Sequence, residues 1–196
     1  MPLSAPTART PIHTRRIEGH GYRRADGLWD IEGSLVDVKA YPFQNQFRGT
    51  IETGEPLHEM WLRLTVDDTL TIRAVEAHTD NGPYAACPDI TPNFQLLVGL
   101  KIRAGFTRAV AERVGGVAGC THMGELVGRL ATVAFQTVFP VLARERGERS
   151  GAAPSSAKAK RPPPLLNSCH VFASDSDVVR TQWADFYTGD RSQPAE

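Results

Sequence analysis

The chain has 196 residues, a formal net charge of zero and a hydrophobic content of 41%, which suit one folded domain with a single core and some tail. Balanced charge argues against a dedicated nucleic-acid-binding protein, because neutralising phosphates normally requires a strong excess of Lys and Arg. Three cysteines at wide spacing, an odd number, argue against a disulfide framework and favour a reducing cytoplasm.

The first half of the chain has the alternation of β-strands. Apolar and polar residues alternate over 27–38, which predicts a half-buried strand with a candidate irregularity at Gly33. The segment 41–56 is rich in Pro and Gly and is expected to be a loop with a short strand at 48–52. Residues 60–74 alternate more cleanly around a polar turn at their centre, which predicts a β-hairpin.

The second half has a helical period. A Thr N-cap followed by Pro predicts a short helix over 91–99, and a second helix is expected over 107–114. The longest helix begins at Cys120 or Thr121 and should bend or end near Pro140. Strands followed by helices indicate an α+β fold, in which three helices pack on one face of a small antiparallel sheet of three or more strands.

Composition also divides the chain. We expect a disordered tail at 1–12, an α+β domain over 13–145 and a linker rich in Pro, Ala and Ser over 146–164. The last segment, 165–196, regains apolar and aromatic residues and is expected to dock on the domain as an arm.

No stretch is expected to cross a membrane. The most apolar stretch, 126–142, is interrupted by Gly128, Arg129 and Pro140, and the opening residues lack the apolar segment of a signal peptide. The sequence therefore predicts a cytoplasmic protein without a membrane or nucleic-acid partner.

The strongest chemical signal is Cys120 with His122 at the start of the long helix. A thiolate at a helix N-terminus is stabilised by unpaired N–H groups and the helix dipole, which makes it a better nucleophile or ligand. Thiolate and neutral imidazole are preferred ligands of zinc and also bind iron. A helix cap and a half-buried histidine are the plainer interpretation. Further candidate ligands are Cys87, His58, His78, Cys169 and His170.

Two groups of charged residues have both a plain and a functional interpretation. Asp30, Glu32 and Asp37 lie near one another along a strand, and the first two share a face, which suits either paired-carboxylate catalysis or an ordinary polar face. A cationic rim for a carboxylate or phosphate, or a solvated surface, would be formed by His13, Arg15, Arg16, Arg23 and Arg24.

The phrases at 26–33, 60–65 and 119–123 resemble a bacterial family of domains of unknown function (DUF family 2889), and the likeness covers 13–139 together with the Cys169-His170 pair. This resemblance implies one folded domain and no particular activity.

The order of elements and cysteines is similar to that of the NifU, IscU and SufE scaffold and sulphur-acceptor proteins. Cys87 and Cys120 fall at matching places, which implies a sulphur-handling or iron–sulphur role. However, no cysteine lies between the first two strands, and His122 follows the last cysteine instead of preceding it. A mononuclear site of Cys87, Cys120 and His122, completed by His58 or Cys169, agrees better with these residues.

Three hypotheses follow. The first is a metal-binding or sulphur-handling accessory protein with zinc or iron at this site, structural if four protein ligands close it and open to substrate if three do. The second is an enzyme in which His122 activates Cys120 as a nucleophile toward an acyl or thioester substrate anchored by Arg23 or Arg24. The third is a non-catalytic ligand-binding or interaction module whose pocket is lined by Trp29, Trp61 and Trp183. A homodimer through an edge strand is compatible with all three.

Overall fold

A computed structural model of the chain describes residues 3–150, 162–163 and 165–190. The chain divides into two compact units, Met1–Glu148 and Arg149–Glu196. Each unit has its own contacts and is described by itself.

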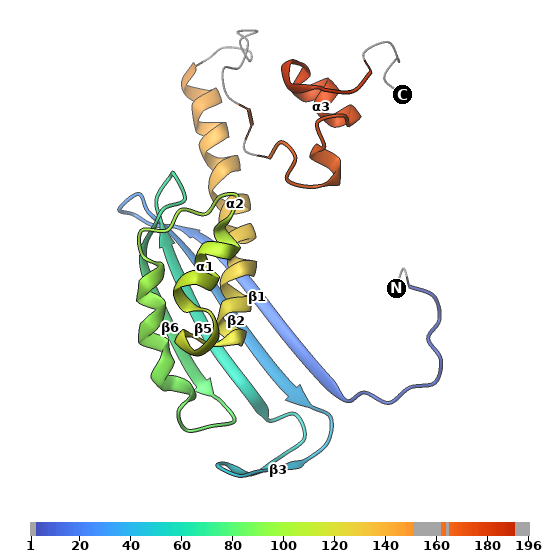
Figure 1. Cartoon of the computed structure of the whole chain (residues 1–196), viewed down its shortest axis with the longest axis vertical. Coiled ribbons are helices and arrows are strands. Elements are labelled where there is room, and N and C mark those ends of the chain that lie inside the picture. The colour runs from blue at the N-terminus through green and yellow to red at the C-terminus, as the bar shows by residue number, and fades with distance from the viewer. Residues whose placement is uncertain (1–2, 151–161, 164, 191–196) are drawn as a thin grey trace. The chain divides into compact units, whose positions relative to one another are not determined.

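The first unit contains a four-stranded antiparallel sheet, a separate β-hairpin and helices that follow them (Figure 1). Its strands are β1 (His13–Arg23), β2 (Trp29–Lys39), β3 (Phe43–Asn45), β4 (Gly49–Ile51), β5 (Pro56–Val66) and β6 (Ile72–Asn81). Its helical segments are the 3-10 helix η1 (Cys87–Leu97), α1 (Phe106–Val114), the 3-10 turn η2 (Gly116–Ala118) and α2 (Thr121–Ser150). The order of the large sheet is β1-β2-β5-β6, and β3 pairs with β4. The predicted α+β class and antiparallel sheet are confirmed.

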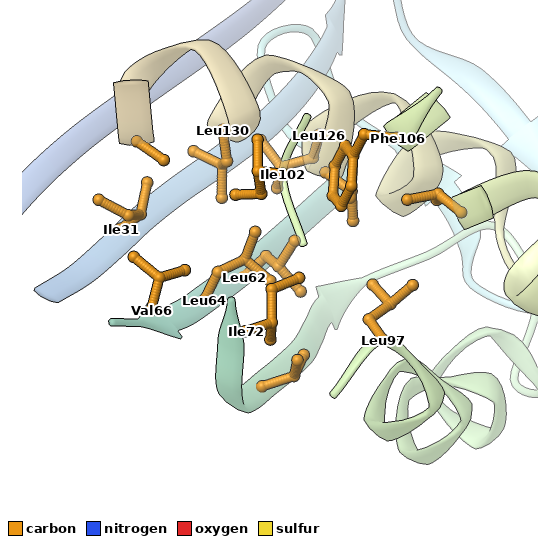
Figure 2. Packing of buried hydrophobic residues seen from close by; sticks show 14 of the residues in the cluster. Ile31, Leu62, Leu64, Val66, Ile72, Leu97, Ile102, Phe106, Leu126 and Leu130 are labelled. Atoms are coloured by element: carbon orange, nitrogen blue, oxygen red, sulfur yellow. The ribbon is translucent and has the colours of Figure 1, made fainter. Parts of the chain in front are cut away.

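One face of the sheet supplies the core. In the register of β2 with β5, Ile31 opposes Leu64 and Leu35 opposes Met60, and all four side chains are buried. α2 and α1 lie over this inner face (Figure 1). In Figure 2 the contacts come from Leu126 and Leu130 of α2, Phe106 of α1 and Leu97 of η1. Burying each such side chain contributes about 1.5–3 kcal/mol.

Glycines on the inner face let α2 approach the sheet closely. Gly33 pairs regularly with Gly19 of β1, and a Cβ at Gly33 would lie 2.7 Å from Leu130 Cδ2 and 2.9 Å from the Glu18 carbonyl oxygen. The strand is therefore regular at Gly33, where the sequence suggested an irregularity. The register of β2 with β5 shifts instead just after Asp37.

Other expectations about the elements are corrected. The short helix expected over 91–99 is the end of the 3-10 helix η1, which begins earlier, at Cys87, and ends at Leu97. α2 continues past Pro140 to Ser150, so the first residues of the expected linker are helical; residues 151–161 and 164 lie outside the described ranges. The three-helix arrangement is therefore not confirmed. β1 was not predicted, and residues 3–12 before it form no helix or strand.

The second unit is built of short helical segments. Phe172 stacks on Trp183 with ring centroids 5.2 Å apart, the Ser176 side chain caps a helix by accepting from the Val179 N–H, and Val179 is buried. The segments are η3 (His170–Phe172), α3 (Asp177–Gln182) and η4 (Ala184–Phe186). Docking of this arm on the first unit stays a prediction.

The described residues include one helical stretch, Thr121–Gly147, that is long and apolar enough to cross a bilayer by length and composition. The expected interruption at Gly128, Arg129 and Pro140 is not found, because α2 continues through all three residues. Core helices of soluble proteins pass the same test, and Leu126 and Leu130 of α2 pack on the sheet.

Candidate functional site

A cluster of charged and imidazole side chains lies where the apolar stripe of the inner face ends. Arg15 of β1, Asp37 of β2 and His58 of β5 are directly opposite one another across three strands. Because opposed residues point to the same face of a sheet, all three belong to the inner face. His122 and Glu125, from the first turns of α2, meet this triplet.

Asp37 is the centre of the cluster. Its side chain is only 1% exposed, and it accepts two hydrogen bonds from Arg15, Nε to Oδ1 at 2.8 Å and Nη2 to Oδ2 at 2.7 Å. His13 Nε2 lies 3.1 Å from Oδ1, and His58 Nδ1 lies 3.0 Å from Oδ2. Burial alone would raise the pKa of Asp37, but the hydrogen bonds and charge of Arg15 outweigh it, and the pKa is lowered. Asp37 is therefore an ionised carboxylate held by basic groups.

Arg15 connects the sheet to α2. Besides its fork on Asp37, its Nη1 donates to Glu125 Oε2 at 2.6 Å. The hydrogen bond to Asp37 is the main reason that the pKa of Arg15 is raised. Arg15, Asp37 and Glu125 together carry a formal charge of −1, which Arg129 balances with its Nη2 3.7 Å from Glu125 Oε1.

Two neutral imidazoles lie side by side next to Asp37. The ring centroids of His58 and His122 are 3.9 Å apart, and the ring planes are tilted by 34°. Burial lowers the pKa of both histidines; the charge of His122 lowers that of His58 further, and the charge of Arg15 lowers that of His122. An ionised carboxylate only accepts hydrogen bonds, so His58 Nδ1 must carry its proton toward Asp37 and Nε2 keeps a lone pair.

Cys120 lies at the start of α2, as the sequence predicts. Its carbonyl accepts the first helical hydrogen bond, from the Gly124 N–H at 2.8 Å, which is the N-cap position. The half-buried thiol has its Sγ 3.9 Å from His122 Nδ1. The structure thus joins Cys120 to the imidazole pair through His122.

This cluster has the composition and spacing of a metal site. Asp37, His58 and His122 each offer one ligand atom, and these atoms all lie within 4.8 Å of one another. In a tetrahedral zinc site, neighbouring ligand atoms are about 3.3–3.8 Å apart. Small side-chain rotations would therefore suffice to close this group around an ion.

The other predicted ligands lie elsewhere. Cys87 begins η1 and is close to Gly82, and it is not part of the group of possible ligands found among the described residues. Cys169 is exposed in the second unit. His78 is exposed on β6, with its Nε2 2.9 Å from Asp80.

The structure also separates residues that two hypotheses bring together. Trp29 is buried on the inner face, whereas Trp61 points from the outer face of β5 and is 46% exposed, so the two do not line one pocket. Arg23 forms an ion pair with Glu145 and lies eight residues along β1 from Arg15, about 27 Å at the rise of a strand. It is therefore remote from Cys120 as a substrate anchor.

Asp37 is the member of the cluster that sequence reasoning did not include among the candidate ligands, because it was grouped with Asp30 and Glu32. Those two residues alternate onto the outer face, whereas Asp37 shares the odd-numbered face of Ile31 and Leu35. A carboxylate in register with a buried apolar stripe was the available signal.

A family model described as "Protein of unknown function (DUF2889)" matches residues 13–136. The matched region contains Asp37, His58 and His122, and Cys169 lies outside it. Comparisons with curated proteins and with solved structures find no match. The resemblance to the NifU, IscU and SufE proteins is therefore not supported.

Proposed function

Because the chain belongs to the DUF2889 family, whose description names no activity, we propose a function from its site alone: the protein binds one divalent transition-metal ion of the zinc class through His58 and His122. The observation that carries this proposal is the convergence of two half-buried, neutral imidazoles and a buried carboxylate within 4.8 Å. Neutral imidazole is the protonation state that coordinates a metal.

The partners of each group suggest separate roles. Both oxygens of Asp37 already accept hydrogen bonds from Arg15, so its carboxylate is better suited to orient His58 than to coordinate the ion directly. A carboxylate that fixes a ligating imidazole from behind is a common outer-shell arrangement in metal sites.

Cys120 lies outside the group formed by Asp37, His58 and His122; it is the proposed third ligand because its thiol, at the start of a helix, is 3.9 Å from His122 Nδ1. Two imidazoles and one thiolate form a donor set that zinc and iron both accept. Three protein ligands leave a position for water or substrate, which suits Lewis-acid chemistry or delivery of the ion in a reducing cytoplasm.

The proposal is tested by metal content and affinity. The untagged chain should bind about one equivalent of Zn²⁺ in calorimetric titration and retain it in plasma mass spectrometry. His58→Gln and His122→Gln should each weaken binding by at least about tenfold, as should Cys120→Ser. The matched controls His78→Gln and Cys87→Ser, both outside the cluster, should leave affinity unchanged. Failure of the wild-type chain to bind Zn²⁺ or Fe²⁺ at micromolar concentration would reject the metal function.

A second candidate rests on the Cys120–His122 contact itself. A thiol at a helix N-cap beside an imidazole suits a nucleophile for acyl or thioester substrates. Rapid alkylation of Cys120 by iodoacetamide at neutral pH, slowed in His122→Gln and unaffected by added Zn²⁺, would favour this function. Protection of Cys120 by one equivalent of Zn²⁺ would favour the metal site.

A further inference from the structure

β1 is a long, free edge of the sheet. It pairs with β2 along all its residues without a register shift, but in the order β1-β2-β5-β6 no strand from the described part of the chain lies on its other side. Its eleven residues include no proline, and nearly all of them are exposed. Natural proteins usually shorten, bend or cover such an edge, because its free N–H and C=O groups pair readily with another strand.

The hydrogen bonds at the two ends of β1 identify which backbone groups are free. The Ile12 carbonyl accepts from the Ala40 N–H, and the Arg24 N–H donates to the Leu28 carbonyl. Hydrogen-bonding direction alternates along a strand, so even-numbered residues of β1 bond toward β2. The N–H and C=O groups of the odd-numbered residues, Ile17 at their centre, therefore point outward from the sheet.

We propose that a second copy of this chain pairs with this edge, antiparallel, about a twofold axis at Ile17. In that register Ile17 faces its own copy, and Arg15 faces Gly19 of the second copy. His13 likewise faces Gly21, so five opposed pairs of odd-numbered residues would share about ten main-chain hydrogen bonds. The two sheets would join as one continuous eight-stranded sheet. This inference does not depend on the proposed metal site.

The side chains of the outer face support this register. With the axis at Ile17, Arg16 lies opposite Glu18 of the second copy, once on each side of the axis, and Ile12 lies opposite Tyr22. Ile12 and Tyr22 are large hydrophobic side chains that are 54% and 49% exposed in the single chain. Cross-strand pairs of opposite charge and of apolar with aromatic residues both stabilise antiparallel pairing.

Neighbouring registers are worse. In each alternative register the twofold axis passes through a different residue of β1. An axis between two residues is excluded, because opposed residues would then lie on different faces of the joined sheet. Moving the axis to Arg16 or Glu18 sets like charges directly against each other, and moving it to Gly19 sets Arg15 against Arg23. The axis at Ile17 avoids each of these conflicts, so the sequence of β1 is complementary to itself.

A hollow next to the edge offers space for the second copy. It has a volume of about 370 Å³ between β1 and α2, and its walls include the apolar side chains of Ile17, Leu130 and Val133. In the dimer, Ile17 of each copy lies on the axis beside this hollow. Pairing would thus bury apolar surface and also give hydrogen-bond partners to the free N–H and C=O groups of β1.

The first test uses charge reversal. By analytical ultracentrifugation, the full chain should have twice its 21.4 kDa mass at about 100 µM. Arg16→Glu or Glu18→Arg alone should raise the dimer dissociation constant at least tenfold, because each creates two like-charge pairs. The double variant Arg16→Glu/Glu18→Arg should restore it. Arg103→Glu, an exposed charge reversal outside β1, is the control. A wild-type monomer, or a double variant that stays as weak as the singles, would overturn the proposal.

The second test fixes the register. Opposed Cα atoms in a hydrogen-bonded pair are about 5.5 Å apart, within the range that a disulfide spans. Ile17→Cys should therefore cross-link two copies under mild oxidation. Thr14→Cys should not, since its copy lies six residues away along the paired strand, about 20 Å. Cross-linking of Thr14→Cys equal to that of Ile17→Cys would exclude the register.

Discussion

Asp37 is a charge buried on an otherwise apolar face, and such a group is stable only when it is paired and hydrogen-bonded. Its two oxygens have contacts with Arg15, His13 and His58 that replace the lost water. Arg15 in turn binds Glu125, which ties the first turns of α2 to three strands. One residue therefore organises both the stability of this corner and the orientation of its imidazoles.

Replacing the carboxylate by an amide tests this role. Asp37→Asn should destabilise the protein by about 2–4 kcal/mol, because an amide nitrogen would face basic donors and the charge of Arg15 would lose its partner. The free energy of unfolding, measured with urea, checks the prediction. Asp80→Asn, at an exposed carboxylate, is the control and should change stability by less than about 0.5 kcal/mol. Equal effects of the two substitutions would contradict the role of Asp37.

At the site, the sequence predicts the residues that local position determines. Cys120 and His122 are recognisable because a Gly precedes them and a helical period follows. Their partners Asp37 and His58 depend on strand register, which pairs residues 21 positions apart. Cys87 was chosen by its chemical type and by its place in the order of elements shared with the scaffold proteins, and neither determines where it lies in space; it is outside the cluster.

Among the elements, those with a clear apolar period are predicted and those without it are not. β2 and β5 alternate because their inner residues fill the core, whereas in β6 the buried residues are Ile72, Val75 and Thr79, because the register with β5 shifts near Ile72. β1 has Gly19 and Gly21 on its inner face, where α2 leaves no room for a side chain, and its other residues are mostly exposed. Its pattern therefore resembles a loop. Pro140 suggests a helix end, yet α2 continues past it.

The close approach of α2 to the sheet gives a prediction about how these two elements pack. Gly33→Ala should destabilise the protein by about 1–3 kcal/mol, since its Cβ would collide with Leu130 and with the Glu18 carbonyl. Adding Leu130→Ala should cost less in this background than in the wild type, because the two changes share one space. Urea unfolding of the single and double variants measures this coupling.

Gly128→Ala is the matched control for this prediction. Gly128 is an exposed helical glycine on α2 with no atoms near its missing Cβ, so alanine should stabilise the protein by about 0.5–1 kcal/mol. Gly33→Ala that is neutral or stabilising would mean that α2 can move away from the sheet without cost.

The chain has a net charge of zero, but its charged side chains lie in two different environments, the surface and the cluster around Asp37. Charged side chains at the surface are mostly in exposed ion pairs such as Arg63 with Glu32, and such pairs contribute little to stability. The cluster around Asp37 differs because its groups are partly or fully buried, so solvent screens their interactions less. Among the described residues, the resolved pKa shifts that lie near neutral pH are those of His58 and His122, so the pH dependence of stability between pH 7.5 and 5 should come mainly from this corner of the fold.

The expected profile follows from the directions of these shifts. His58 and His122 have pKa values lowered below the ordinary 6.5, mainly by burial, so below pH 6.5 the unfolded chain binds more protons than the folded one. Metal-free protein should therefore lose stability as pH falls from 7.5 to 5, by at most about 1.4 kcal/mol per pH unit for each histidine. Below pH 3.8 a second loss should follow, as Asp37 and Asp67, whose pKa is lowered to about 2, become protonated.

Thermal unfolding in the presence of a chelator checks this profile. The double variant His58→Gln/His122→Gln should flatten the slope between pH 7.5 and 5 and keep the loss at lower pH, because it leaves both carboxylates in place. His78→Gln, at an exposed histidine, should keep the wild-type slope. A slope that survives in the double variant would assign acid sensitivity to other groups, whereas a flat wild-type profile would mean that these imidazoles titrate alike in the folded and unfolded chain.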